Sequence, residues 1–525
     1  MIARLILWLQ SPRYDNGRSH RLLTGLLAGI TGLVLVGSGW AITAGHSKLL
    51  FIAVAIVALF ALVLNQRGAS IGLLLLTAMD GLPFVDSTQP VSGKLTIQDI
   101  AVVTLVISAV VWMLIDDSFH CQSRGGLAVS RAGALLLLWW FWNFARAISV
   151  QHVPAQVAAD FVREFAFFGL LLILLPRVRL TARDLRTLLT VVLAGVCLFA
   201  VAQIATALGY AHPGALLHVD HTLQQSGLTR VYSDMTDLVL AGLAASIAAS
   251  LAAPNRRVRL LARPIALLLT ASVVVQLTRA RWIGLVAALL LVGLYISFSG
   301  DQRIPSVLRR RIALLIGVPL TAILVLLLLD PTITSGGTVF NRLGSIVTDL
   351  ESGGGTVAIR ESVTNSMTMY LGGSWLTGLG FLPPSVHYFF GLPDGSILDS
   401  DLGVLNAVMT MGVVGAILIY LPLFLVLAQC LQRTRTSVVR PYEWLRFGGA
   451  VWILATLLSS ITLVTLFSTS GLVLTAVALT VLVHPSVIGM PAHSAVPLGR
   501  SSRPMRSASQ PRISQARTST SPRSP

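Results

Sequence analysis

The chain has 525 residues, of which 54% are hydrophobic and only 11% are charged, and its formal net charge is +17. A soluble domain carries about 25% charged residues, so this composition excludes an ordinary soluble protein. The cysteines, Cys121, Cys197 and Cys430, have neither a disulfide pattern nor the spacing of a zinc site.

Apolar runs long enough to cross a bilayer recur along the chain. They predict an all-α fold, a polytopic transmembrane helical bundle of about 12–14 spans with one long extracytoplasmic loop between late spans. The third span is short and runs into Asp80-Gly81-Leu82-Pro83, which predicts a broken or half-spanning helix. The predicted spans are 22–42, 49–65, 69–83, 97–115, 132–150, 158–176, 185–209, 236–253, 263–279, 282–299, 311–330, 402–429, 444–463 and 465–484.

The connectors alternate in charge, which predicts the orientation of the bundle. Cytoplasmic connectors of membrane proteins are enriched in Lys and Arg. With the N-terminus inside, all but nine of the 38 basic residues fall on the cytoplasmic side. Both termini are then expected in the cytoplasm of a bacterial inner membrane. The nine residues expected outside are Lys48, Lys94, Arg146, Arg163, Arg230, Arg279, Arg281, Arg342 and Arg360.

This topology divides the chain into five regions. Residues 1–21 form a cytoplasmic N-terminal segment, and 22–330 hold transmembrane helices 1–11. Residues 331–401 form the large extracytoplasmic loop, and 402–484 hold helices 12–14. The tail, 485–525, is rich in Ser, Pro and Arg and is expected to be disordered, because it has too few apolar residues to bury a core.

Arginine on the outer side runs against the topology rule, so each such residue needs a reason. A guanidinium stays charged and its planar fork matches phosphate oxygens. Several that converge in one outer cavity would bind a diphosphate. The alternatives are a local ion pair, such as Arg163 with Glu164, or a side chain that snorkels to the interface. The candidates for a diphosphate site are Arg163, Arg230, Arg279, Arg281, Arg342 and Arg360.

Two acids precede the span at 402 and are candidates for a general base. Asp399 or Asp401 could accept a proton from an acceptor hydroxyl, or could simply cap the free amides of the next helix. His387 lies in the same loop but is more typical of an inert surface histidine. His218, Asp220 and His221 give only a weak metal signal, so no metal and no cofactor are expected.

Four pieces of sequence form a pattern around the long outer loop. They are Leu228-Thr229-Arg230-Val231-Tyr232; Thr278-Arg279-Ala280-Arg281-Trp282-Ile283-Gly284; Arg342-Leu343, Arg360 and Gly378-Leu379-Gly380; and Asp401 with Met411-Gly412-Val413-Val414-Gly415. Through these residues the chain resembles, from about residue 80 to 484, the O-antigen ligase and polymerase superfamily. In the ligases, His-Asn usually opens the last motif, and Asp401-Leu402 stands there in this chain, which favours the polymerase-like branch.

The resemblance implies glycosyl transfer on the outer face of the membrane. The donor would be a glycan on a polyprenyl diphosphate, and the acceptor a hydroxyl of another glycan, a lipid or a protein. The outer arginines would stabilise the diphosphate leaving group, and Asp401 or Asp399 would take the acceptor proton. Membrane lipid and other polysaccharide-assembly proteins are further expected partners, and nucleic acid is not.

A lipid-linked oligosaccharide flippase is the alternative, because many spans around a cationic cavity also suit a transporter. Transporters usually have paired halves with discontinuous helices at matching positions, and this sequence has one asymmetric loop instead. A third interpretation makes the outer loop a binding platform without catalysis. Convergence of Arg230, Arg279 and Arg360 beneath the loop would favour the enzyme.

Overall fold

The computed structural model covers part of the chain. The spans predicted at 22–42, 49–65 and 311–330 lie outside the described residues, as does the N-terminal segment 1–21. The described residues are 66–81, 90–92, 95–116, 120–212, 221–225, 228–233, 235–276, 278–298, 364–365, 368, 371–380, 403–432, 442–461, 463 and 469–488.

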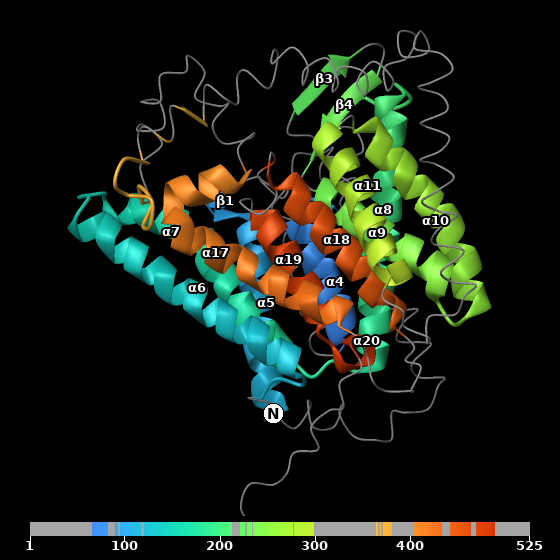
Figure 1. Ribbon diagram of the computed structural model, residues 1–525, viewed down its shortest axis with the longest axis horizontal. Coiled ribbons are helices and arrows are strands. Elements are labelled where there is room, and N and C mark those ends of the chain that lie inside the picture. Colours follow the sequence, from blue (N-terminus) through green and yellow to red (C-terminus); the bar gives the residue numbers. More distant parts are fainter. Residues whose placement is uncertain are drawn as a thin grey trace, which may run out of the picture.

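Helices that pack side by side make up most of the described part of the chain (Figure 1). Six of them are long and apolar enough to cross a membrane, which confirms the predicted all-α polytopic bundle. The helices are α4 (Arg67–Ala78), α5 (Ile97–Ile115), α6 (Arg124–Ser149), α7 (Ala155–Leu174), α8 (Ala182–Ala207), α9 (Met235–Ala252), α10 (Arg256–Val275), α11 (Arg279–Phe298), α17 (Gly403–Leu431), α18 (Trp444–Ser459), α19 (Thr469–Leu482) and α20 (Pro485–Ile488), with a 3₁₀ turn, η2, at Leu175–Arg177.

The helix starts follow from local sequence signals. Thr181 and Asp184 form a capping box at the start of α8, in which each side chain accepts a hydrogen bond from the other's backbone N–H. Thr96 and Asp99 form the same motif at the start of α5. Such caps pair amides that the first helical turn leaves free, and in a membrane protein they mark where helices meet the polar boundary.

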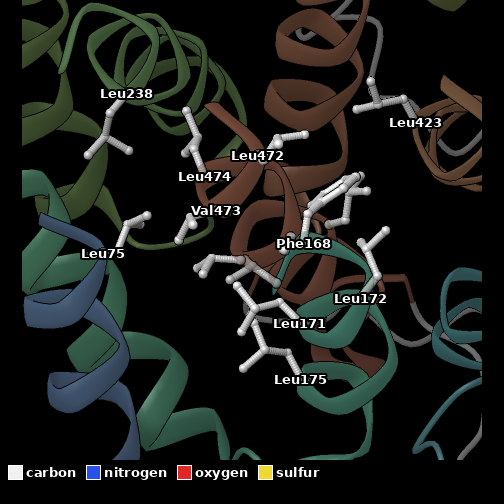
Figure 2. Packing of buried hydrophobic residues seen from close by; sticks show 14 of the residues in the cluster. Leu75, Phe168, Leu171, Leu172, Leu175, Leu238, Leu423, Leu472, Val473 and Leu474 are labelled. Atoms are coloured by element: carbon white, nitrogen blue, oxygen red, sulfur yellow. The ribbon is translucent and has the colours of Figure 1, made fainter. Parts of the chain in front are cut away.

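Helix α19 lies at the centre of the bundle and is buried on all sides. Its apolar residues point in several directions. Val473 faces Leu75 of α4, and Leu472 faces Phe168 of α7 (Figure 2). A helix that is apolar all round is stable only where neighbours or lipid surround it. The other helices therefore pack around α19.

Small residues allow the helices to approach closely. Helices α6 and α7 meet at Gly133 and Gly169, where a Cβ added to Gly133 would lie 3.0 Å from the Gly169 carbonyl oxygen. Inside a membrane, helix association depends on such packing, because lipid removes the hydrophobic driving force that operates in water.

Hydrogen bonds join helix ends at one side of the bundle. Arg67 at the start of α4 donates through Nη2 to Asp116 after α5 at 2.8 Å, and through Nη1 to the carbonyl oxygen of Arg179 at 2.9 Å. We call this side the basic end. The arginines at the basic end are Arg67, Arg124, Arg177, Arg179, Arg183, Arg186, Arg256, Arg257, Arg259 and Arg446. At the opposite, distal end, the described side chains include Arg146, Arg163 and Arg281.

The end of α10 and the start of α11 correct the break between the spans predicted at 263–279 and 282–299. The break comes earlier, after Gln276, and α11 begins at Arg279. Helix α10 packs along α8 and α9, whereas α11 packs along α18. The two helices therefore separate from a short connection and do not form a tightly packed hairpin, and Trp282 Nε1 closes the junction by donating to the Val273 carbonyl oxygen at 2.9 Å.

Short strands and a terminal helix were not predicted. The connector 210–235 contains an antiparallel hairpin of β3 (His221–Gln225) and β4 (Leu228–Tyr232), and β1 (Pro90–Ser92) pairs with β2 (Leu95–Thr96). The predicted disordered tail begins at 485, but α20 occupies its first residues, and Val487 is fully buried.

His484, between α19 and α20, makes stability at the basic end sensitive to pH. Its Nε2 donates to the Leu180 carbonyl oxygen at 2.9 Å, and its Nδ1 accepts from the Ser486 N–H at 3.2 Å. Because a carbonyl oxygen only accepts, the ring is the neutral Nε2–H tautomer. Burial lowers the pKa of His484 below its ordinary value, more than the Leu180 hydrogen bond and Asp184 raise it.

We predict that the free energy of unfolding falls as the pH drops below about 6.5, the ordinary histidine pKa. The unfolded chain binds this proton more readily than the folded one, so the contribution of neutral His484 is complete above that pH and is lost below it. Thermal unfolding of the purified protein between pH 7.5 and 5.5 measures the effect. His484→Gln should flatten the profile and exposed His212→Gln should keep it; an unchanged slope in His484→Gln would contradict the assignment.

Candidate functional site

Helix α17 is broken, which corrects the single span predicted at 402–429. Gly412 has φ 71° and ψ 178°, so the chain turns a corner between residues 403–411 and 413–431 (Figure 1). A positive φ of this size favours glycine, because a Cβ would clash with the backbone. The second part is about 28 Å long at about 1.5 Å per residue, which is enough to cross a bilayer by itself.

The segment 371–380 of the long loop docks onto this break. Each of the hydrogen bonds that joins them lies between backbone groups, and they fall on both sides of Gly412. The break leaves amides and carbonyls without helical partners, and the loop pairs them. The bonds run from the Leu379 N–H to the Met409 oxygen (2.7 Å), from the Gly380 N–H to the Thr410 oxygen (3.0 Å) and from the Val413 N–H to the Trp375 oxygen (2.8 Å).

Glycines allow this close contact of two backbones. A Cβ on Gly378 would lie 2.4 Å from the Gly412 nitrogen, and a Cβ on Gly412 would lie 2.2 Å from the Leu376 oxygen. Both distances are far below contact, and Gly378 also has a positive φ, 69°. Gly378 and Gly412 are therefore both required, for space as well as for backbone conformation.

The end of α6 holds the docked loop from the side. Arg146 Nη1 donates to the carbonyl oxygens of Thr377 (3.3 Å) and Gly378 (3.1 Å), and the Gln151 side chain donates to the Leu379 oxygen. Trp139 Nε1 donates to the Met411 oxygen at 3.1 Å, next to the break. Side chains of α6 thus contact both the loop and the broken helix.

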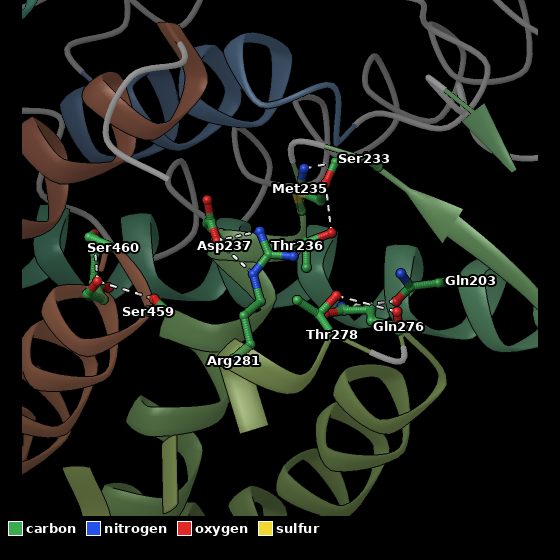
Figure 3. A network of polar contacts seen from close by, with 11 residues as sticks. Gln203, Ser233, Met235, Thr236, Asp237, Gln276, Thr278, Arg281, Ser459 and Ser460 are labelled. Carbon is green, nitrogen blue, oxygen red and sulfur yellow. Dashed lines mark hydrogen bonds and ion pairs between the residues drawn. The ribbon is translucent and has the colours of Figure 1, made fainter. Parts of the chain in front are cut away.

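Arg281 forms an ion pair at the distal end (Figure 3). Its Nε and Nη2 donate to one oxygen of Asp237, at 3.1 and 2.8 Å, and each side chain is 17% exposed. Arg281 lies in the first turn of α11 and Asp237 in the first turn of α9, so the pair joins two helix starts. The carboxylate neutralises the charge that was predicted to bind a diphosphate.

Uncharged polar side chains lie beside this pair. Gln276 Nε2 donates to Gln203 Oε1 at 3.4 Å (Figure 3). Ser272 donates to the same oxygen. Gln203, Ser272 and Gln276 are all buried, and Gln203 Nε2 and Gln276 Oε1 have no hydrogen-bond partner in the described part of the chain. Buried amides of this kind give α8 and α10 a polar contact inside an otherwise apolar interface.

Arg163 is also paired with a carboxylate. Its Nε lies 3.3 Å from Asp99 Oδ1, and Asp99 is 4% exposed and already holds the capping box of α5. The pair joins α7 to α5, whereas Arg281 joins α11 to α9. The described partner is Asp99; the side chain of Glu164, the predicted local partner, lies outside the described residues, so that pair stays a prediction. These two arginines therefore stabilise helix contacts at separate places in the bundle.

The remaining predicted site residues have no described side chain. Arg230 lies in β4 opposite Leu223, and Arg279 begins α11. Arg342, Arg360, His387, Asp399 and Asp401 lie outside the described residues, so whether Arg230, Arg279 and Arg360 converge stays a prediction. Among the residues that the structure covers, no cluster of His, Cys, Asp and Glu could hold a metal ion.

Sequence reasoning missed Arg146, Trp139 and Asp237 as site residues. Arg146 was counted among the outer arginines, and the signal that singles it out is its place one turn after an aromatic run, Trp139-Trp140-Phe141-Trp142. Asp237 had the signal of a carboxylate inside a predicted span, where a charge needs a partner. Comparison with known protein families and with curated proteins finds no match for this chain.

We predict that Gly412→Ala releases the loop from α17. The added methyl meets the Leu376 carbonyl, and alanine disfavours the required φ by about 1–2 kcal/mol before the clash is counted. Limited proteolysis of the purified protein should cut 371–380 faster in Gly412→Ala and in Gly378→Ala. Gly373→Ala is the control, because a Cβ there meets nothing within 4 Å. Equal cleavage in all three variants would contradict the docking.

We predict strong coupling between Asp237 and Arg281. Asp237→Asn leaves a guanidinium without its carboxylate and should cost about 3 kcal/mol of unfolding free energy. Adding Arg281→Gln should recover part of that loss, since no unpaired charge is then left. Chemical denaturation of the single and double variants in detergent measures this. Exposed Arg257→Gln should stay within about 0.5 kcal/mol of the parent. Purely additive losses would show that the pair is not an interacting unit.

Proposed function

We propose that the chain is a membrane glycosyltransferase of the polysaccharide-polymerase or O-antigen-ligase type. It acts on the extracytoplasmic face and transfers a glycan from a polyprenyl diphosphate to an acceptor hydroxyl. The observation that carries this is the contact between Gly378-Leu379-Gly380 and Met411-Gly412-Val413. These motifs are more than thirty residues apart, both belong to the family pattern, and they pack backbone against backbone.

The other parts of the pattern support the same proposal by their position. Arg281 pairs with Asp237 at the start of α9, which directly follows β4 and its Arg230. The segment 278–284 and the segment 228–232 therefore lie at the distal end, as the docked loop does. Most of the described arginines lie at the opposite end, so the topology rule favours a cytoplasmic basic end and an extracytoplasmic distal end.

The proposed reaction divides the work between acid and arginine. The acceptor oxygen attacks the anomeric carbon, the bond from that carbon to the diphosphate oxygen breaks, and Asp401 or Asp399 takes the hydroxyl proton. Charge that develops on the leaving diphosphate requires cations. Because Arg163 and Arg281 are neutralised by Asp99 and Asp237, this role falls to Arg230, Arg279, Arg342 and Arg360.

A flippase for lipid-linked oligosaccharide is the second candidate, and the break in α17 favours it. Discontinuous helices are typical of transporter binding sites. The break at Gly412, however, is filled by the docked loop, and its carbonyls at Met409 and Thr410 are paired. Transporter sites leave such groups free for the substrate or a coupling ion. We therefore place the enzyme first.

We predict that Asp401→Asn, or Asp399→Asn if the latter is the base, lowers glycan transfer about 10²–10⁴-fold, the usual contribution of a general base. The measurement compares surface glycans and lipid-linked intermediates in the bacterium that carries each variant. Asp394→Asn, an acid of the same loop, should leave transfer unchanged.

Each product pattern has a distinct meaning. Single lipid-linked repeat units that accumulate would indicate a polymerase, and long lipid-linked chains a ligase. Intermediates retained in the inner leaflet would favour the flippase. Unchanged glycans in both variants, with the protein present at the parent level, would exclude the general base and favour a binding platform.

A further inference from the structure

A hollow on the side of the bundle lies between α6 and α17. It measures about 340 Å³ and is lined by Leu135, Leu138, Trp139, Trp142 and Leu418. We call it the α6–α17 groove. Leu138 is 66% exposed and Leu135 is 50% exposed, so the groove opens on the outside of the bundle, where acyl chains of the bilayer lie.

A chain of stacked groups connects the groove to the docked loop. Trp142 stacks on Trp139 with ring centroids 4.9 Å apart, and the Arg146 guanidinium lies 5.7 Å from the Trp142 ring centre. Trp139 is fixed by the Met411 oxygen at the break, and Arg146 by Gly378 of the loop. Whatever contacts Trp142 in the groove therefore lies beside the groups that hold the loop.

Arg146 differs from the other described arginines of the distal end. Arg163 and Arg281 each have a carboxylate partner, whereas Arg146 pairs with no carboxylate among the residues that the structure describes. Its Nη1 binds neutral carbonyl oxygens, which leaves Nε and Nη2 for a ligand. The carbonyl end of α6 offsets only part of the charge. A cation in this place attracts an anion at the membrane boundary.

We propose that the α6–α17 groove binds an acidic glycerophospholipid, with an acyl chain along Trp139 and Trp142 and the phosphate on Arg146. One unpaired guanidinium matches the single negative charge of a phosphatidylglycerol phosphodiester. A diphosphate carries more charge than this groove balances, and a zwitterionic lipid would add a cation beside Arg146. The lipid stabilises the docked form of 371–380, and this role is independent of the glycosyl transfer proposed above.

The test uses the full-length protein in detergent with added phosphatidylglycerol or phosphatidylcholine. Native mass spectrometry counts bound lipid, and the thermal unfolding temperature and protease sensitivity of 371–380 report its effect. Phosphatidylglycerol should bind and protect the loop, and phosphatidylcholine should not. Arg146→Gln should weaken phosphatidylglycerol binding about tenfold, as expected for loss of a charge-assisted hydrogen bond.

Matched variants separate this groove from general charge and general lipid contact. Arg257→Gln removes an exposed arginine at the basic end, and Leu267→Ala trims a lipid-facing residue of α10 that is 73% exposed. Both should keep parental binding, while Trp142→Leu should lose it. Arg146→Lys retains the charge and should still bind phosphatidylglycerol more tightly than phosphatidylcholine, which keeps the test decisive if Arg146→Gln does not fold.

Three results would overturn the proposal. Equal binding of phosphatidylglycerol and phosphatidylcholine to the parent protein would remove the role of the charge. Loss of binding in Arg257→Gln with full binding in Arg146→Gln would move the lipid to the basic end. Tighter binding of a polyprenyl monophosphate than of phosphatidylglycerol would make the groove a site for the proposed donor. None of these measurements depends on turnover, so failure of the glycosyltransferase assay would not be mistaken for failure of lipid binding.

Discussion

The distal end of the bundle depends on the backbone pairing between the long loop and the break in α17. Hydrocarbon offers no partner to an unpaired amide or carbonyl, so a break in a membrane helix persists only where protein or water satisfies the freed groups. The loop does so at Met409, Thr410 and Val413 through its own backbone. The arrangement in turn needs glycine at Gly378 and Gly412, because any Cβ would separate the two chains.

Charge at the distal end follows a second constraint. A lone arginine inside a bundle costs several kcal/mol unless a partner compensates it. Asp237 meets Arg281, and Asp99 meets Arg163, so these arginines hold helices together and have little charge to offer a ligand. Arg146 satisfies carbonyl oxygens instead. Its charge therefore remains at the edge of the bundle, next to the groove and the loop.

The helices could be predicted from the sequence because a helix that crosses a bilayer must be apolar over the thickness of the hydrocarbon core. The span predicted at 97–115 coincides with α5, and the one predicted at 236–253 differs from α9 by one residue at each end. The break in α17 could not be predicted in this way. Residues 402–429 are mostly apolar and carry no charge, and Gly412 is one of three glycines within that run, so hydropathy alone merges its two parts.

The partners within the candidate site could not be predicted either, since each contact joins distant positions. Asp237 and Arg281 are 44 residues apart, and Trp139 and Met411 are 272 apart. The sequence did identify the outer arginines as residues that needed an explanation. The structure separates those paired with a carboxylate from Arg146, which binds carbonyl oxygens. Arg163 and Arg281 are explained by carboxylates that the topology rule does not consider.

The corner at Gly412 also explains why α17 is longer than a span requires. Residues 413–431 are long enough to cross a bilayer by themselves, so 403–411 is an additional short helix at the distal end. It is fixed at its start, where the Val404 N–H donates to the Ser460 oxygen at 2.9 Å, and at its end by the docked loop. Asp401 precedes this helix by two residues in the sequence. Because this short helix is fixed at both ends, the chain is anchored two residues after Asp401, the proposed general base. Catalysis by a carboxylate depends on such positioning.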